Sequence, residues 1–69
     1  MEYEITFIVK ESLDGGYEAN CVGYSIFTEG ETIDEIKSSI KEAVHCHFED
    51  DQMPKMIRVL FQKEEVIAA

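Results

Sequence analysis

The sequence predicts a small α+β domain in which three strands, one helix and a closing strand follow one another along 69 residues. Two observations predict it: a glycine turn between two segments of alternating polarity, and a later segment whose apolar residues recur every three or four positions. We expect a mainly antiparallel four-stranded sheet in the order 3-2-1-4, with the helix packed on one face. At this length only one domain fits, so residues 1–69 are expected to form a single unit.

A β-hairpin opens the predicted domain. Its turn is Asp14-Gly15-Gly16, because glycine adopts the positive φ angles that tight hairpin turns require. The first strand alternates in polarity, and its apolar face carries Tyr3, Ile5, Phe7 and Val9. The second strand places Tyr17, Ala19 and Cys21 on one side. Residues 25–28 are rich in strand formers, so a third strand is expected there.

The predicted helix begins after Thr32, which forms a capping-box pattern with Glu35. Apolar residues then recur at helical spacing, and they are Ile33, Ile36, Ile40, Ala43, Val44, His47 and Phe48. We expect the helix at about residues 33–50, before Pro54. Residues 56–62 have little polar interruption and are expected to form the closing strand, beside the first strand and parallel to it.

The charge of the chain restricts its partners. Fifteen acidic residues against six basic ones give a net charge of −9, which repels phosphate backbones and anionic lipids, so we expect no direct binding to nucleic acid or membrane. No apolar segment approaches the roughly 20 residues that span a bilayer, and no signal peptide is recognisable. A cytoplasmic protein is expected, without a cofactor and with Cys21 and Cys46 as reduced thiols.

Several segments, in order and spacing, resemble the N-terminal domain of HicB-type antitoxins over about residues 3–62. They are Tyr3-x-Ile5, Asp14-Gly15-Gly16-Tyr17-Glu18-Ala19, Thr28-Glu29-Gly30-Glu31-Thr32-Ile33-Asp34-Glu35-Ile36 and Lys41-Glu42-Ala43-Val44. The resemblance implies a partial ribonuclease H-like fold of the same element order. It also implies binding without catalysis, namely sequestration of a small basic HicA-type toxin that cleaves mRNA. An acidic antitoxin suits a basic toxin, because complementary charge accelerates association.

The resemblance also bears on assembly and on contact residues. Many HicB proteins carry a C-terminal DNA-binding domain, and none is expected in this chain. One helix covers one sheet face, so we expect a homodimer or larger homo-oligomer to cover the other, which includes Ile8 and Val22. The candidate partner-binding residues are Tyr17, Glu18, Asn20, Tyr24 and Glu29. Ordinary sheet packing of the tyrosines and solvation of the acids are the simpler alternatives for these positions.

A different class of function rests on His45, Cys46 and His47, with Glu49 close behind. On a helix His45 and Glu49 share a face, so a small metal-binding protein or a hydrolase is an alternative. His45 and His47, however, project about 200° apart. The simpler interpretation is that His47 completes the apolar stripe and Cys46 is a partly buried thiol. A HicB-like domain with an unknown partner is the third possibility.

Catalysis of the ribonuclease H type is not expected. Such enzymes hold two metal ions with clustered carboxylates. The core face of the first strand offers only apolar and aromatic residues, and Glu2 and Glu4 lie on the other face. A helix that continued to Asp50 would also place acids at the negative end of its dipole. A helix that ends before Asp50 would remove that conflict.

Overall fold

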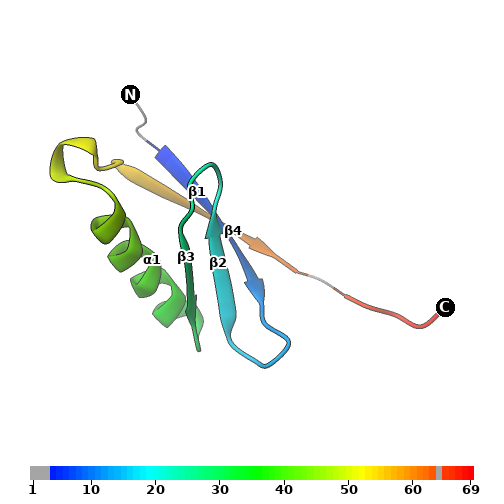
Figure 1. Cartoon of the computed structure of the whole chain (residues 1–69). Helices are drawn as coiled ribbons and strands as arrows, with labels where there is room; N and C mark the ends of the chain where they lie inside the picture. Colours follow the sequence, from blue (N-terminus) through cyan, green and yellow to red (C-terminus); the bar gives the residue numbers. More distant parts are fainter. Residues whose placement is uncertain (1–3, 64) are drawn as a thin grey trace.

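A computed structural model describes residues 4–63 and 65–69. Tyr3, which was expected at the start of the first strand, lies outside the described residues. Within them the predicted order of elements is confirmed (Figure 1). The elements are β1 (Glu4–Glu11), β2 (Tyr17–Cys21), β3 (Phe27–Gly30), α1 (Ile33–His47), the 3₁₀ turn η1 (Asp50–Gln52) and β4 (Met56–Gln62).

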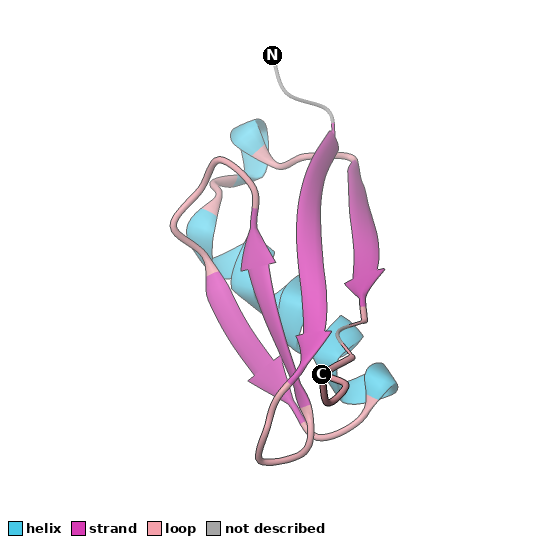
Figure 2. Ribbon diagram, turned by 90° about the vertical axis from the view of Figure 1, so that its right-hand side faces the viewer, coloured by secondary structure: helices cyan, strands magenta, loops and turns pink. Residues whose placement is uncertain are grey.

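The four strands form one sheet in the order β3-β2-β1-β4, as predicted. The pairs β1–β2 and β2–β3 are antiparallel, whereas β1 and β4 are parallel. The sheet is therefore mixed: the parallel pairing of the closing strand with the first is as expected, and the description as mainly antiparallel is only slightly off. Helix α1 lies across one face only, and the opposite face has no covering element in the described part of the chain (Figure 2). We call that second face the open face.

The hairpin turn forms where the glycines predicted it. Gly15 and Gly16 have φ angles of 92° and 79°, and the amide of Ser12 donates to the carbonyl of Gly16 at 3.0 Å. The third strand begins at Phe27, two residues later than expected. The cause is a turn that precedes it, in which the amide of Cys21 donates to the carbonyl of Ile26 at 3.0 Å.

Helix α1 begins as predicted and ends earlier. The hydroxyl of Thr32 accepts a hydrogen bond from the amide of Glu35 at 3.1 Å. At the other end Phe48 is extended, with ψ 143°, so the helix stops at His47 and not near residue 50. The acids that follow belong to η1 and its flank, which removes the conflict with the helix dipole. No helix in residues 4–63 and 65–69 has both the length and the apolar character to cross a membrane.

The core lies between α1 and the sheet. Its buried side chains are Ile5, Phe7, Val9, Ala19, Cys21, Ile26, Ile36, Ile40 and Val44. The predicted helical stripe is too wide, because Ile33 and His47 are exposed. Cys46 is exposed as well, which corrects its expected partial burial. The buried face of α1 is therefore narrower than predicted, and it packs on only part of the sheet.

The backbone of β3 passes close to the first turn of α1 at Gly30. A Cβ atom added there would lie 2.8 Å from the backbone nitrogen of Ile36 and 3.1 Å from the carbonyl carbon of Glu35. Both are backbone atoms of the first helical turn, so β3 and α1 would have to separate. We expect Gly30→Ala to lower the free energy of unfolding by about 1–3 kcal/mol, measured by urea titration.

The matched control for this prediction is Glu29→Ala, one residue earlier on the same strand and exposed. Its free energy of unfolding should stay within about 0.5 kcal/mol of the parent value. Equal unfolding midpoints for Gly30→Ala and Glu29→Ala would show that the close approach does not constrain the fold.

Candidate functional site

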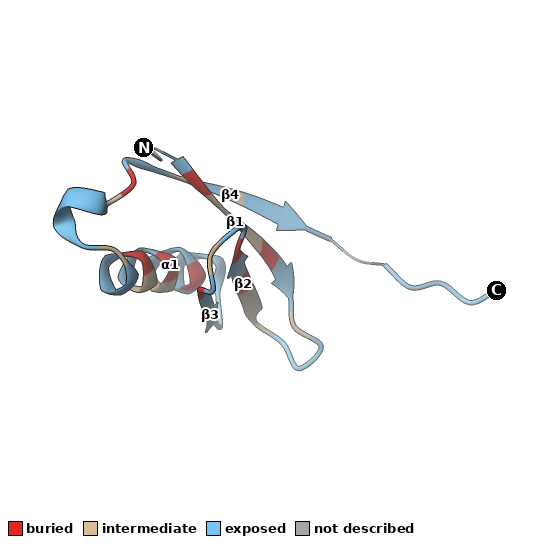
Figure 3. Ribbon diagram, turned by 45° about the horizontal axis from the view of Figure 1, so that its top comes forward, coloured by how far each residue is buried: buried red, intermediate tan, exposed pale blue. Residues whose placement is uncertain are grey.

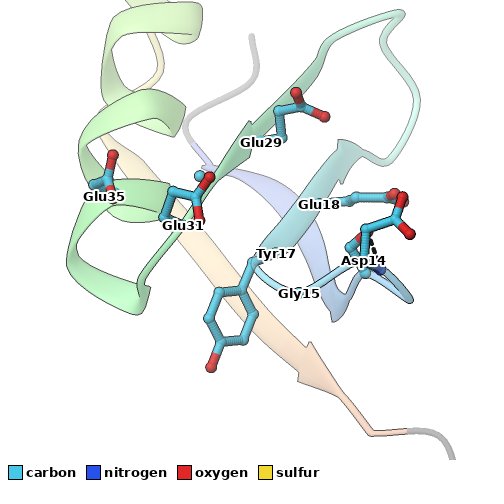
Figure 4. A pocket seen from close by; sticks show the side chains of 9 residues that line it. Asp14, Gly15, Tyr17, Glu18, Glu29, Glu31 and Glu35 are labelled. Atoms are coloured by element: carbon cyan, nitrogen blue, oxygen red, sulfur yellow. Dashed lines mark hydrogen bonds between the residues drawn. The ribbon is translucent and has the colours of Figure 1, made fainter.

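A groove of about 410 Å³ lies at the hairpin end of the sheet, beside the start of α1. Its lining residues are Ser12, Asp14, Gly15, Tyr17, Glu18, Glu29, Gly30, Glu31 and Glu35. Five of these nine are acidic and none is basic. We call it the acidic groove, and Figure 4 shows its side chains.

Three local structures bring these carboxylates together. The hairpin turn holds Asp14, whose amide donates to the hydroxyl of Ser12 at 3.4 Å. The register of β2 and β3 sets Glu18 opposite Glu29, and because opposite residues share a face, both project from the open face. The segment that starts α1 supplies Glu31 and Glu35. Figure 4 shows Asp14 and Glu18 pointing the same way, with Glu31 and Glu35 on the far side of the groove.

The charges in the groove are not balanced locally. Like charges directly opposite on an antiparallel pair are destabilising, which is the arrangement of Glu18 and Glu29. Lys10 of β1 neighbours Glu18 on its other side, but it does not line the groove. Arg58 forms its ion pair with Glu4, Nη2 to Oε2 at 3.1 Å, at the opposite end of β1. The groove therefore offers an excess of negative charge to a cationic partner.

The structure gathers some of the expected partner-binding residues and separates others. Tyr17, Glu18 and Glu29 line the acidic groove. Asn20 lies further along the open face, in one row with Phe27, Ile8 and Leu60 across the strands. Tyr24 is half-buried beside the end of α1, where its ring meets the ring of Phe48 edge-on at 5.0 Å. Tyr24 therefore packs against the end of α1, and not within the sheet as the simpler alternative had it.

Three groove residues were missed as site candidates. Asp14 and Glu35 were interpreted from the sequence as turn and cap residues, and their backbone amides do donate hydrogen bonds in those local structures. Glu31 was noted as part of the segment that resembles HicB antitoxins. The sequence does carry a signal for them, because acidic residues are frequent around the predicted hairpin turn and around the start of the predicted helix. Only the strand register shows that these segments meet at one end of the sheet.

The residues of the metal-binding alternative are not gathered into a site. His45, Cys46 and Glu49 are exposed, and Glu49 lies beyond the end of the helix. The ring of His47 packs edge-on against Tyr24 at 5.9 Å and against Phe48 at 4.9 Å. In the described ranges 4–63 and 65–69, no three His, Cys, Asp or Glu side chains are arranged to hold a metal ion.

Two relatives are similar to most of the chain. A UPF0150 protein of Thermotoga maritima is 49% identical over 65 residues, which cover 94% of this chain and 91% of that protein. A UPF0150 protein of Archaeoglobus fulgidus is 44% identical over 52 residues, which cover 75% and 77%. Neither name states an activity or a partner. No family model matches the chain, and no solved structure matches it.

The two cysteines should differ sharply in reactivity. Cys21 is buried in the core, and desolvation by burial raises the pKa of its thiol. A raised pKa lowers the fraction of reactive thiolate at neutral pH, whereas Cys46 is exposed. We expect an aromatic disulfide reagent to modify one thiol rapidly in the folded protein, with the second reacting only in denaturant.

The control is Cys46→Ser, which should abolish the rapid phase and leave the denaturant-dependent phase. Absorbance of the released thiolate follows both phases. Two rapid phases in the folded parent protein would contradict the burial of Cys21.

Proposed function

The chain belongs to the UPF0150 family, and we propose that it is a non-catalytic binding protein that sequesters a small basic protein of the HicA toxin type. The observation that carries the proposal is the acidic groove, with five carboxylates and no basic side chain in its lining. The resemblance to HicB antitoxins supports the same kind of partner. Because that partner cleaves mRNA, we propose the cytoplasm as the place of action.

Charge is the first contribution to binding. A hollow lined by charges of one sign focuses the electrostatic potential and increases the association rate of an oppositely charged protein. The net charge of −9 adds a weaker attraction at longer range, which salt screens over about 10 Å at 0.1 M. The groove therefore selects basic proteins and disfavours nucleic acid.

The pair Glu18 and Glu29 supplies a more specific contact. Opposite Cβ atoms on antiparallel strands are about 5 Å apart, so one guanidinium or ammonium group can lie between the two carboxylates. Arginine suits this position because it donates several hydrogen bonds in a fixed plane. Its arrival would remove the repulsion that the two glutamates impose on the free protein.

Sequestration follows from competition for the same charges. A ribonuclease that binds RNA must present cationic side chains to the phosphates. If those side chains lie in the acidic groove, they are not available to RNA. Neutralisation then requires no chemistry from this chain.

No specific observation favours the second candidate, a metal-binding or hydrolytic protein. It would need His45, Cys46, His47 and Glu49 around one centre, and the ring of His47 is packed against Tyr24 and Phe48 instead. Metal content of the purified, untagged chain distinguishes the two functions, because the binding protein requires no stoichiometric zinc or nickel.

Co-expression with any small basic protein that is encoded beside this chain tests the proposal. We expect a complex that is recovered by pull-down and a rescue of growth from the toxin. The triple variant Glu18→Gln, Glu29→Gln and Glu31→Gln should slow association by about tenfold or more at low salt, measured by stopped-flow or surface plasmon resonance.

The control triple Glu49→Gln, Asp50→Asn and Asp51→Asn removes the same charge beside the end of α1, away from the groove. It should retain most of the association rate. Equal losses of association rate in both triple variants would show that only net charge matters. If no small basic protein is encoded beside the chain, or if none forms a complex with it, the chain is not a paired antitoxin.

A further inference from the structure

Strand β4 occupies the edge of the sheet, yet five of its seven residues are apolar. On the helix side it carries Ile57, Val59 and Phe61, which align with the core residues of β1. On the open face it carries Met56 and Leu60, which alternate with Arg58 and Gln62. Edge strands of monomers are usually short, charged or interrupted by proline, whereas β4 has seven residues, no proline and one charged residue, Arg58.

Helix α1 covers little of this strand, although Ile57 and Val59 are half-buried against the core. It packs over β3 and β2, and Figure 3 shows β4 largely exposed at the side of the sheet away from the helix. The ring of Phe61 is 51% exposed and Leu60 is 48% exposed. The outer edge of β4 also has no strand beside it in the described chain. An apolar surface and a row of unpaired backbone groups therefore coincide.

The segment after β4 extends this surface. Residues 65–69 project away from the sheet (Figure 1), and Val66 and Ile67 are 86% and 87% exposed. Of the nine exposed large apolar side chains in the described residues, five lie between positions 56 and 67. The exposed apolar surface is thus concentrated in one short stretch of the chain.

The charges of residues 55–63 indicate which partner can pair with the edge of β4. Residues 55–63 contain Lys55, Arg58 and Lys63 and no acid, although the chain as a whole carries −9. Arg58 is paired with Glu4 of β1. Glu64 and Glu65 follow directly in the sequence, so the stretch is basic along the strand and acidic beyond it. Two copies that run in opposite directions bring each acidic part beside the basic part of the other.

We propose that a second copy of this chain pairs with the free edge of β4, antiparallel and about a twofold axis at Leu60. Each Leu60 then faces its own counterpart, Val59 faces Phe61 of the second copy, and position 55 faces position 65. Such an interface is isologous, as in most homodimers. It joins the two sheets into one of eight strands, twice the four of each copy, with both helices on the same side.

This inference goes beyond the proposed toxin binding and does not depend on it. The acidic groove is formed by the hairpin turn, β2, β3 and the start of α1, whereas the dimer uses the opposite edge of the sheet. Both grooves stay accessible in the dimer. The oligomeric state can therefore be measured on this chain alone, without any toxin.

Sedimentation velocity of the full chain tests the pairing. We expect a species of twice 7.9 kDa, and we expect Leu60→Lys to raise its dissociation constant by about 100-fold, because two like charges would meet on the axis. The matched control is Phe27→Lys, which changes an exposed side chain on the opposite edge strand and should leave the dimer intact. Circular dichroism checks that both variants are folded.

Cysteine cross-linking locates the axis without a destabilising charge. Facing Cα atoms in an antiparallel pair are about 4.5–5.5 Å apart, within the range of a disulfide. In a Cys46→Ser background, Leu60→Cys should form a covalent dimer with oxidised glutathione, and Phe27→Cys should not. A monomer at about 100 μM, a dimer that Leu60→Lys leaves unchanged, or cross-linking only through Phe27→Cys would overturn the proposal.

Discussion

One helix has to cover a four-stranded sheet, and it covers only one face and only part of that face. The buried residues of α1, Ile36, Ile40 and Val44, meet the helix-side residues of β1 and β2. Gly30 permits this packing, because the backbone of β3 passes the first helical turn without room for a Cβ atom. The open face, the uncovered β4 and the groove beside the helix start all follow from this placement.

Local patterns in the sequence were sufficient for most of the fold. The glycines of the hairpin and the cap at Thr32 act over a few residues, so their effects were predictable. The helix end was not, because the sequence pattern continues past His47 while the chain turns at Phe48. The predicted burial of His47 and Cys46 was wrong for a related reason. The part of the sheet beneath α1 is narrow, so it buries only a narrow stripe of the helix.

The candidate site was only partly predictable, because it depends on register and not on local pattern. Glu18 and Glu29 are eleven positions apart in sequence and directly opposite in the sheet. A shift of one residue in that pairing would turn one of them to the other face. Asp14, Glu31 and Glu35 have local roles that fully explain their residue types. Nothing in their own segments reveals that they share a groove.

The two edges of the sheet differ in charge, and this difference separates the two proposed modes of binding, namely capture of a basic protein and self-association. The β3 side carries unbalanced carboxylates, and the β4 side carries three basic residues without an acid between positions 55 and 63. The two proposals use opposite edges of the sheet, so a basic protein in the acidic groove would not compete with self-association. A dimer formed through β4 would place its two acidic grooves at the outer ends of a continuous sheet. If the proposed basic partner binds in these grooves, its two copies would lie at opposite ends of the dimer.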